Sequence, residues 1–100
     1  MNLISKINIV ISYDISNNKL RRKIEKTLKN YGIRIQYSIF NCHITVVQKI
    51  KIQTSLDSLL KKYCNLISDS DSIIVFENIN TEKIKFILGN TCNFEKYVVY

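Results

Sequence analysis

The sequence predicts an α+β fold in which two helices cover one face of an antiparallel sheet. Apolar residues alternate along residues 7–13, which indicates a strand. Leu20, Ile24 and Leu28 then recur at helical spacing, and residues 56–67 carry a second stripe of this kind. With further strand-like segments between and after these helices, the order becomes strand, helix, strand, strand, helix, strand. This order is the ferredoxin-like βαββαβ plan.

The first strand and first helix follow from local patterns. The more apolar face of the strand carries Ile7, Ile9, Ile11 and Tyr13. Asn17 or Asn18 can cap the helix, because a short side-chain oxygen satisfies the free amides there. Gly32 is expected to end the helix, since glycine readily adopts the left-handed conformation that is common after helices.

The rest of the chain completes the plan. Residues 33–47 alternate and are predicted as a long strand. Thr54 is predicted to begin the second helix, with Asp57 completing a capping box. A turn at 68–72, strands at 73–76 and 83–88, and an additional C-terminal strand in the apolar tail are then expected. We expect residues 1–100 to form a single domain.

Alternation along residues 33–47 places Arg34 and Phe40 on one face of the predicted strand. We expect this to be the sheet face away from the helices. That face also carries Val10 and Asp14 in this interpretation. Because two helices cover one face, the second face must meet water or a partner. The apolar tail, moreover, needs a strand to pair with. Both features favour a homodimer, with a ligand-bound monomer as the alternative.

Composition limits the function classes. The net charge is +7, from 15 Lys and Arg against 8 Asp and Glu, which favours polyanions such as nucleic acid or an anionic membrane surface. The alternative is a genome bias toward Ile, Lys and Asn, which would raise the lysine content without a functional reason. No apolar run is long enough for a membrane span, and no signal peptide is evident. Three widely spaced cysteines indicate reduced thiols and a cytoplasmic protein, without a disulfide framework or structural zinc.

Asp14 is the leading candidate for chemistry, because it stands where a strand gives way to a loop. One carboxylate is a poor metal site, but magnesium often takes one or two and keeps its waters. A two-fold dimer that brought two Asp14 side chains together would supply such a pair. The structural alternative is that Asp14 caps a turn or pairs with Arg21.

Other candidate residues each admit two interpretations. The helix-one cations Arg21, Arg22, Lys23 and Lys26 either face solvent or contact phosphates without reading base sequence. Phe40 is either core or interface, or it stacks on a base. Arg34 either forms an interface ion pair or steadies phosphate charge during cleavage. His43 is expected at the surface, and Asp69 and Asp71 are expected to serve a turn rather than a metal.

Three stretches together resemble the Cas2 family of CRISPR-associated endoribonucleases. They are "VISYDIS", "KLRRKIEKTLKNYGIRIQYSIFNC" and "DSIIVFE". The resemblance implies a ferredoxin-like homodimer in which two Asp14 carboxylates approach across the two-fold axis and hold one Mg²⁺. It also implies a C-terminal strand that can cross to the partner.

The same resemblance implies functional residues and two possible roles. It implies catalytic roles for Tyr13, Asp14, Arg34 and Phe40, with Arg21 and Lys23 among the helix-one cations tied to nuclease activity. One role is metal-dependent cleavage of RNA or duplex DNA during spacer acquisition. The other is a non-catalytic scaffold that bridges CRISPR integrase dimers. A toxin-like ribonuclease or a regulatory domain on the same fold is a third possibility.

This chain departs from the family pattern at several positions. Lys23 stands where some members have Arg, and Asn41 stands where an acid is frequent. A "SNN" loop also replaces a more acidic one after Asp14. These departures weaken the transfer of catalysis more than the transfer of the fold.

Overall fold

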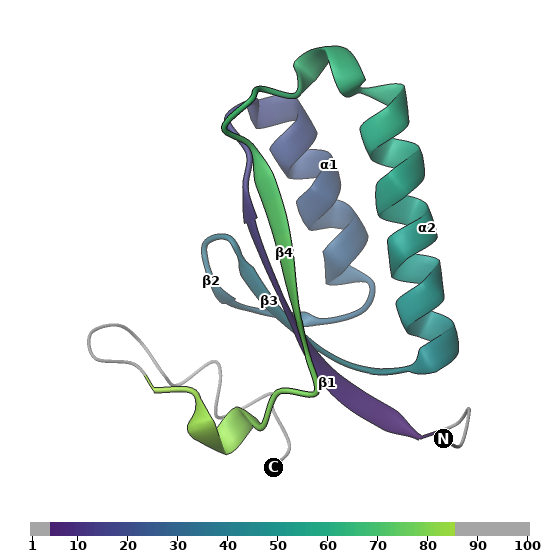
Figure 1. The fold of residues 1–100 in the computed structure, drawn as a ribbon, viewed down its shortest axis with the longest axis vertical. Coiled ribbons are helices and arrows are strands. Elements are labelled where there is room, and N and C mark those ends of the chain that lie inside the picture. The colour runs from purple at the N-terminus through teal and green to yellow at the C-terminus, as the bar shows by residue number, and fades with distance from the viewer. Residues whose placement is uncertain (1–4, 86–100) are drawn as a thin grey trace.

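The computed structural model describes residues 5–85 and has the predicted βαββαβ order (Figure 1). The strands are β1 (Lys6–Asp14), β2 (Ile33–Gln36), β3 (Ile39–Thr45) and β4 (Ser72–Glu77). The helices are α1 (Asn18–Lys29) and α2 (Val46–Lys62), and short 3-10 turns occupy Cys64–Leu66 and Thr81–Lys83. The α+β class expected from the sequence is therefore confirmed.

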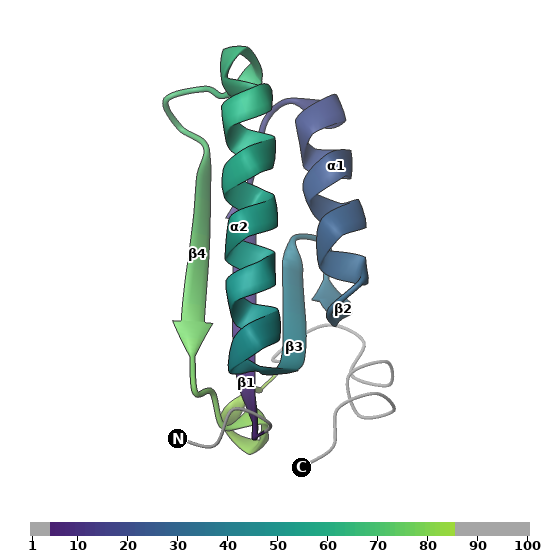
Figure 2. The same ribbon diagram turned by 90° about the vertical axis from the view of Figure 1, so that its right-hand side faces the viewer.

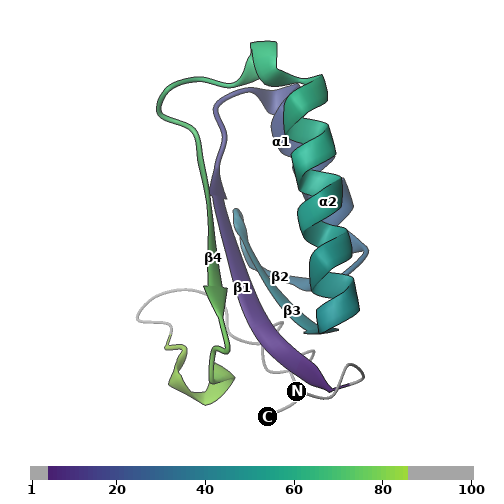
Figure 3. The same ribbon diagram turned by 45° about the vertical axis from the view of Figure 1, so that its right-hand side comes forward.

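The four strands form one antiparallel sheet in the order β2-β3-β1-β4. Both helices lie side by side on one face of this sheet, as Figures 2 and 3 show. Strand β1 is central: Ile11 is opposite Phe40 on β3 and opposite Val75 on β4. Strand β4 is an edge strand, because within residues 5–85 it pairs with β1 alone.

The core lies between the helices and the sheet. Tyr13 and the preceding alternate residues of β1 are buried there, as the alternation predicts. Helix α1 contributes Leu20, Ile24 and Leu28, each fully buried. Asn17 caps this helix, since its side-chain oxygen accepts a hydrogen bond from the Leu20 amide at 3.0 Å.

The prediction of one long strand over residues 33–47 is wrong. Strands β2 and β3 form a hairpin whose turn contains Tyr37 and Ser38, and helix α2 begins at Val46 rather than near Thr54. Thr45 caps α2 in a capping box with Gln48, whose side chain accepts from the Thr45 amide at 3.0 Å. The β-branched residues at the start of α2 resemble strand residues, and this capping box outweighs that preference.

The predicted sheet face of Arg34 and Phe40 is also wrong. Phe40 is fully buried in the core with Ile11 and Tyr13, and Arg34 pairs with Phe40 on the same side. The physical reason is the hairpin, which includes a register shift between Arg34 and Gln36. The true outer face of β3 carries Ile39, Asn41 and His43.

Gly32 has a different role from the one expected. Helix α1 ends at Lys29 with Asn30 as a right-handed cap, and Gly32 itself does not adopt a left-handed conformation. A Cβ at position 32 would instead lie 2.5 Å from both the Asn41 carbonyl oxygen and the Cys42 sulfur. Glycine is required there because β3 approaches the backbone closely.

Two expectations concern residues that the structure does not describe fully. The predicted strand at 83–88 begins in a 3-10 turn, and its last three residues lie outside the described range, as does the apolar tail. In the described part of the chain, no helix is long and apolar enough to cross a membrane.

Candidate nucleic-acid interface and carboxylate site

Asp14 is exposed at the last position of β1, directly opposite Ser72 at the start of β4. Successive side chains of a strand point to opposite faces, so Asp14 lies on the face away from the helices, as expected. Tyr13, its neighbour, points into the core. Among residues 5–85 Asp14 forms no ion pair, with Arg21 or any other cation.

The loop after Asp14 is fixed by a second carboxylate. Asp71 accepts hydrogen bonds from the Ser68 amide at 2.8 Å and the Ser16 amide at 3.0 Å. These two bonds lower the pKa of the Asp71 carboxyl below its usual value. The turn role predicted for Asp71 is supported, and the turn holds the segment that positions Asp14.

Tyr13 and Arg34 meet at a third residue, Glu25 of helix α1. The Tyr13 hydroxyl donates to Glu25 Oε2 at 2.7 Å, with the Tyr37 carbonyl oxygen 3.0 Å away as a second acceptor. Arg34 Nη2 lies 3.1 Å from the same carboxylate oxygen. Burial, followed by hydrogen bonding to Glu25 and its negative charge, raises the pKa of Tyr13 well above its usual value.

Phe40 closes this cluster from the sheet side. The Arg34 guanidinium carbon lies 5.4 Å from the Phe40 ring centroid, and the Tyr13 and Phe40 rings are 6.2 Å apart in a stacked arrangement. Phe40 is fully buried, so within this protomer its ring is not free to stack on a base. Three of the four expected catalytic residues therefore meet under helix α1, while Asp14 lies on the opposite face.

The four expected nucleic-acid-binding cations do not behave alike. Arg22 and Lys26 are exposed on the outer surface of α1. Arg21 instead donates to the Ile15 carbonyl at 3.2 Å and to the Asn18 side chain. Lys23 lies over an aromatic ring, with its nitrogen 5.1 Å from the centroid of Tyr63.

Sequence reasoning missed the residues that join Lys23 at this ring. Lys19 lies 5.4 Å and Lys62 lies 5.5 Å from the same Tyr63 centroid. Lys62 was missed because sequence reasoning placed the start and end of α2 wrongly and assigned Tyr63 to an apolar stripe. The glutamate at position 25 was also missed, although its helical spacing of four from Arg21 places it on the same side of α1 as Arg21, beside the apolar stripe.

The expected Mg²⁺ site can be compared with the side chains that are available to bind an ion. Within residues 5–85 no three His, Cys, Asp or Glu side chains form a group that could hold an ion. Asp14 offers an exposed oxygen donor of the kind magnesium prefers, but one carboxylate per chain is too few without a second. The residues fit Mg²⁺ only where another copy contributes its Asp14.

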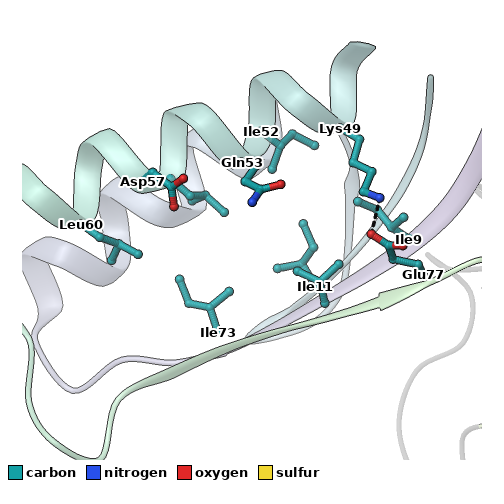
Figure 4. Close-up of a pocket in the computed structure, with 11 residues that line it drawn as sticks. Ile9, Ile11, Lys49, Ile52, Gln53, Asp57, Leu60, Ile73 and Glu77 are labelled. Atoms are coloured by element: carbon teal, nitrogen blue, oxygen red, sulfur yellow. Dashed lines mark ion pairs between the residues drawn. The ribbon is translucent and has the colours of Figure 1, made fainter. Parts of the chain in front are cut away.

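A groove of about 400 Å³ lies between α2 and strands β1 and β4 (Figure 4). Its floor is apolar and includes Ile9, Ile11 and Ile73. Lys49 and Glu77 form an ion pair at one end. Val75 also lines the groove and is 45% exposed, so residues 5–85 leave apolar surface uncovered at the edge of β4. Gln53 and Asp57 of α2 also line the groove, and its apolar floor suits an apolar segment.

These features define a class: a small basic ferredoxin-like domain with one exposed carboxylate at a strand end beside a cationic helix. A model of the family described as CRISPR associated protein Cas2 matches residues 7–85. The chain therefore belongs to the Cas2 family.

Individual relatives agree with this assignment. The "CRISPR-associated endoribonuclease Cas2 2" of Methanospirillum hungatei is 32% identical over 71 residues, which cover 71% of this chain and 72% of that protein. A chain of a partial Cas6-RT-Cas1–Cas2 complex has a TM-score of 0.69 at 22% identity and covers 87% of this chain and 96% of its own length. Cas2 of Streptococcus pyogenes has a TM-score of 0.55 at 20% identity, covering 94% of this chain and 99% of that one. At these identities the two structures show a shared fold.

Proposed function

We propose that this protein binds duplex nucleic acid during CRISPR spacer acquisition and cleaves RNA or DNA phosphodiesters as a homodimer. The observation that carries the proposal is Asp14, which is exposed at the end of β1 and forms no ion pair among residues 5–85, next to a helix that presents Arg22 and Lys26 to solvent. The name of the Methanospirillum hungatei relative supports the endoribonuclease activity.

In the enzyme, the Asp14 carboxylates of the two copies would together hold one Mg²⁺. The ion would supply a more acidic bound water and neutralise charge on the phosphate. Attack of water on phosphorus breaks one P–O bond, and the leaving oxygen takes a proton. Arg22 and Lys26 bind the phosphate backbone, and Asp71 keeps the Asp14 loop in place through the Ser16 amide.

The homodimer is supported by the edge of β4, which no other strand covers among residues 5–85. Ile74, Val75 and Phe76 are each exposed by nearly half, and an edge strand with apolar side chains favours pairing with another strand. The C-terminal strand of a partner chain is the expected occupant. Its apolar side chains would enter the groove between α2 and β4.

A second candidate function is a non-catalytic scaffold that joins CRISPR integrase dimers. The specific observation in its favour is that Tyr13, Arg34 and Phe40 are engaged with one another and with Glu25. In that state they cannot reach a phosphate on the Asp14 face. The similarity to a chain from a Cas1–Cas2 complex is consistent with this candidate.

The deciding experiment compares cleavage of labelled RNA and duplex DNA by the wild-type protein and Asp14→Asn, with and without magnesium. Asp57→Asn is the matched control, because Asp57 is also exposed but lies on α2. Loss of cleavage in Asp14→Asn alone, with the dimer intact by gel filtration, supports the nuclease. Equal activity of both variants, or none in wild type, leaves the scaffold as the better account.

Binding is tested separately from cleavage. The double variant Arg22→Ala/Lys26→Ala should reduce the slope of log affinity against log salt concentration for duplex DNA, under either function. An unchanged slope would mean that the nucleic acid contacts another face.

A further inference from the structure

Three lysines converge on a single tyrosine in the helical layer. The nitrogens of Lys19, Lys23 and Lys62 lie 5.4, 5.1 and 5.5 Å from the Tyr63 ring centroid. Because all three nitrogens lie near one point, any two of them are within about 11 Å of each other. We call these four residues the lysine–tyrosine cluster.

The cluster concentrates positive charge without a balancing acid. Among residues 5–85 the ion pairs are Arg34–Glu25 and Lys49–Glu77, so no lysine of the cluster is paired with a carboxylate. Like charges this close repel, and the ring offsets part of that cost through its negative face. Hydrogen bonding from Lys23 and the positive charge of all three lysines lower the pKa of Tyr63.

Helix electrostatics explain one lysine but not another. Lys62 stands in the last turn of α2, where the helix dipole favours a cation. Lys19 stands in the first turn of α1, where the dipole disfavours a cation and where no acidic residue is present. The helix dipole therefore gives no reason for Lys19 to lie beside two further lysines.

The cluster lies at the same end of the fold as Asp14. Strand β1 ends, α1 begins and α2 ends at the same end of the molecule (Figure 1), so the cluster and Asp14 share that end. The two helices that carry the lysines lie side by side there (Figure 2). Lys19 and Lys62 are exposed, so an anion can reach them.

We propose that the lysine–tyrosine cluster is a phosphate-binding site that holds the backbone of a nucleic acid at the Asp14 end of the molecule. The proposal rests on the proposed nucleic-acid-binding function and adds a site that is distinct from Arg22 and Lys26. Lysine recognises phosphate as a point charge and does not read bases, so the site binds without sequence preference. Tyr63 keeps the three ammonium groups together.

The test is the salt dependence of binding to two 20-bp DNA duplexes of unrelated sequence. The variant Lys19→Ala/Lys62→Ala removes two charges from the cluster. Its matched control, Lys51→Ala/Lys61→Ala, removes two charges from exposed positions of α2 that are not among the cations over the Tyr63 ring. We expect the cluster variant to lower the salt slope by about 2 for both duplexes, at about one unit per phosphate contact. The control should change the slope by much less.

A second pair of variants tests the ring. Tyr63→Phe keeps the aromatic face and should bind as wild type does, whereas Tyr63→Leu removes it and should weaken binding. Thermal unfolding checks that each variant is folded, since Tyr63 packs partly against the core. A loss of affinity in folded Tyr63→Leu, without loss in Tyr63→Phe, supports the proposal.

The outcomes separate this site from the proposed function. Equal slopes in the cluster variant and the wild type, with clear wild-type binding, would overturn the site and leave the proposed function standing. Equal reductions in the cluster variant and its control would reduce the effect to net charge and would also overturn the site. If the wild type bound neither duplex, the site and the DNA-binding function would both be wrong.

Discussion

Arg34 of strand β2 and Glu25 of helix α1 form an ion pair of 3.1 Å beneath the helical layer. The carboxylate oxygen that meets Arg34 also accepts the hydrogen bond from Tyr13. One glutamate therefore links α1 to both β1 and β2. The arrangement assigns Tyr13 and Arg34 a structural task in the single protomer, in addition to any task in catalysis.

Glu25→Gln should destabilise the protein by about 1–3 kcal/mol, because the amide cannot balance the Arg34 charge and the Tyr13 hydroxyl loses its charged acceptor. The measurement is urea unfolding at neutral pH. Glu82→Gln makes the same chemical change at an exposed position and should alter stability by less than about 0.5 kcal/mol. Similar effects of the two substitutions would mean that the ion pair contributes nothing.

A companion variant separates the ion pair from the space it fills. Glu25→Leu/Arg34→Met replaces both charges with apolar side chains of similar length and should recover most of the stability lost in Glu25→Gln, since neither charge is left unpaired. The double variant should also retain whatever cleavage the wild type shows if Arg34 is structural. Loss of cleavage in a stable double variant would instead restore Arg34 to the catalytic group.

Gly32→Ala should destabilise the protein by about 2–3 kcal/mol, at the upper end of the usual cost of overpacking. The new Cβ would lie 2.5 Å from the Asn41 carbonyl oxygen, which is backbone and cannot rotate away. Asn30→Ala, two residues earlier and exposed, is the control and should be nearly neutral. A neutral Gly32→Ala would show that β3 and the segment after α1 can separate without cost.

Periodicity was enough to predict the elements whose signal is local. Leu20, Ile24 and Leu28 define the buried stripe of α1, and Asn17 caps it as expected. The order βαββαβ was expected from the ferredoxin-like plan as a whole, since the turn at Tyr37 and Ser38 that separates β2 from β3 was not recognised. The position of Asp14 on the face away from the helices also followed, since the register of β1 is continuous.

Sequence reasoning failed at one local signal, the start of α2, and at contacts between elements. Thr45 and Gln48 cap α2 within a stretch that alternates like a strand, so the hairpin was missed and Phe40 was assigned to the wrong face. The glutamate that meets Arg34 is nine residues away in sequence and on another element, so its pairing depends on the docking of α1 onto the sheet. The gathering of Lys19 and Lys62 at Tyr63 likewise depends on how the two helices pack.

Cys42 should make the stability of the protein depend on alkaline pH. Burial raises the pKa of the Cys42 thiol from its usual 9.0 to about 11. A raised folded-state pKa means that the unfolded chain loses its proton first, so stability is unaffected below pH 9 and falls between about pH 9 and 11. The loss is of the order of 2–3 kcal/mol for a two-unit shift.

The measurement is the free energy of unfolding from pH 7 to 11 for the wild type and Cys42→Ala. The variant lacks the thiol, so its disadvantage at pH 7 should shrink as the pH rises past 9. Tyr13 also has a raised pKa, but it is present in both proteins and its effect cancels in the difference. A constant difference across this range would contradict the burial of a protonated thiol.

Magnesium should stabilise the wild-type dimer through Asp14. Two carboxylates held near each other repel without metal, so in EDTA Asp14→Asn should be at least as stable as the wild type. At magnesium concentrations about tenfold above the dissociation constant, the wild type should gain about 1.4 kcal/mol, equivalent to a rise of roughly 5–10 °C in the midpoint of thermal unfolding for a domain of this size.

Asp14→Asn should gain nothing beyond the effect of sodium chloride at equal ionic strength. The shift in the wild type should also depend on protein concentration, because the proposed site takes one Asp14 from each of two copies. Equal stabilisation of both proteins by magnesium would place the ion away from Asp14 and remove the paired carboxylates from the mechanism.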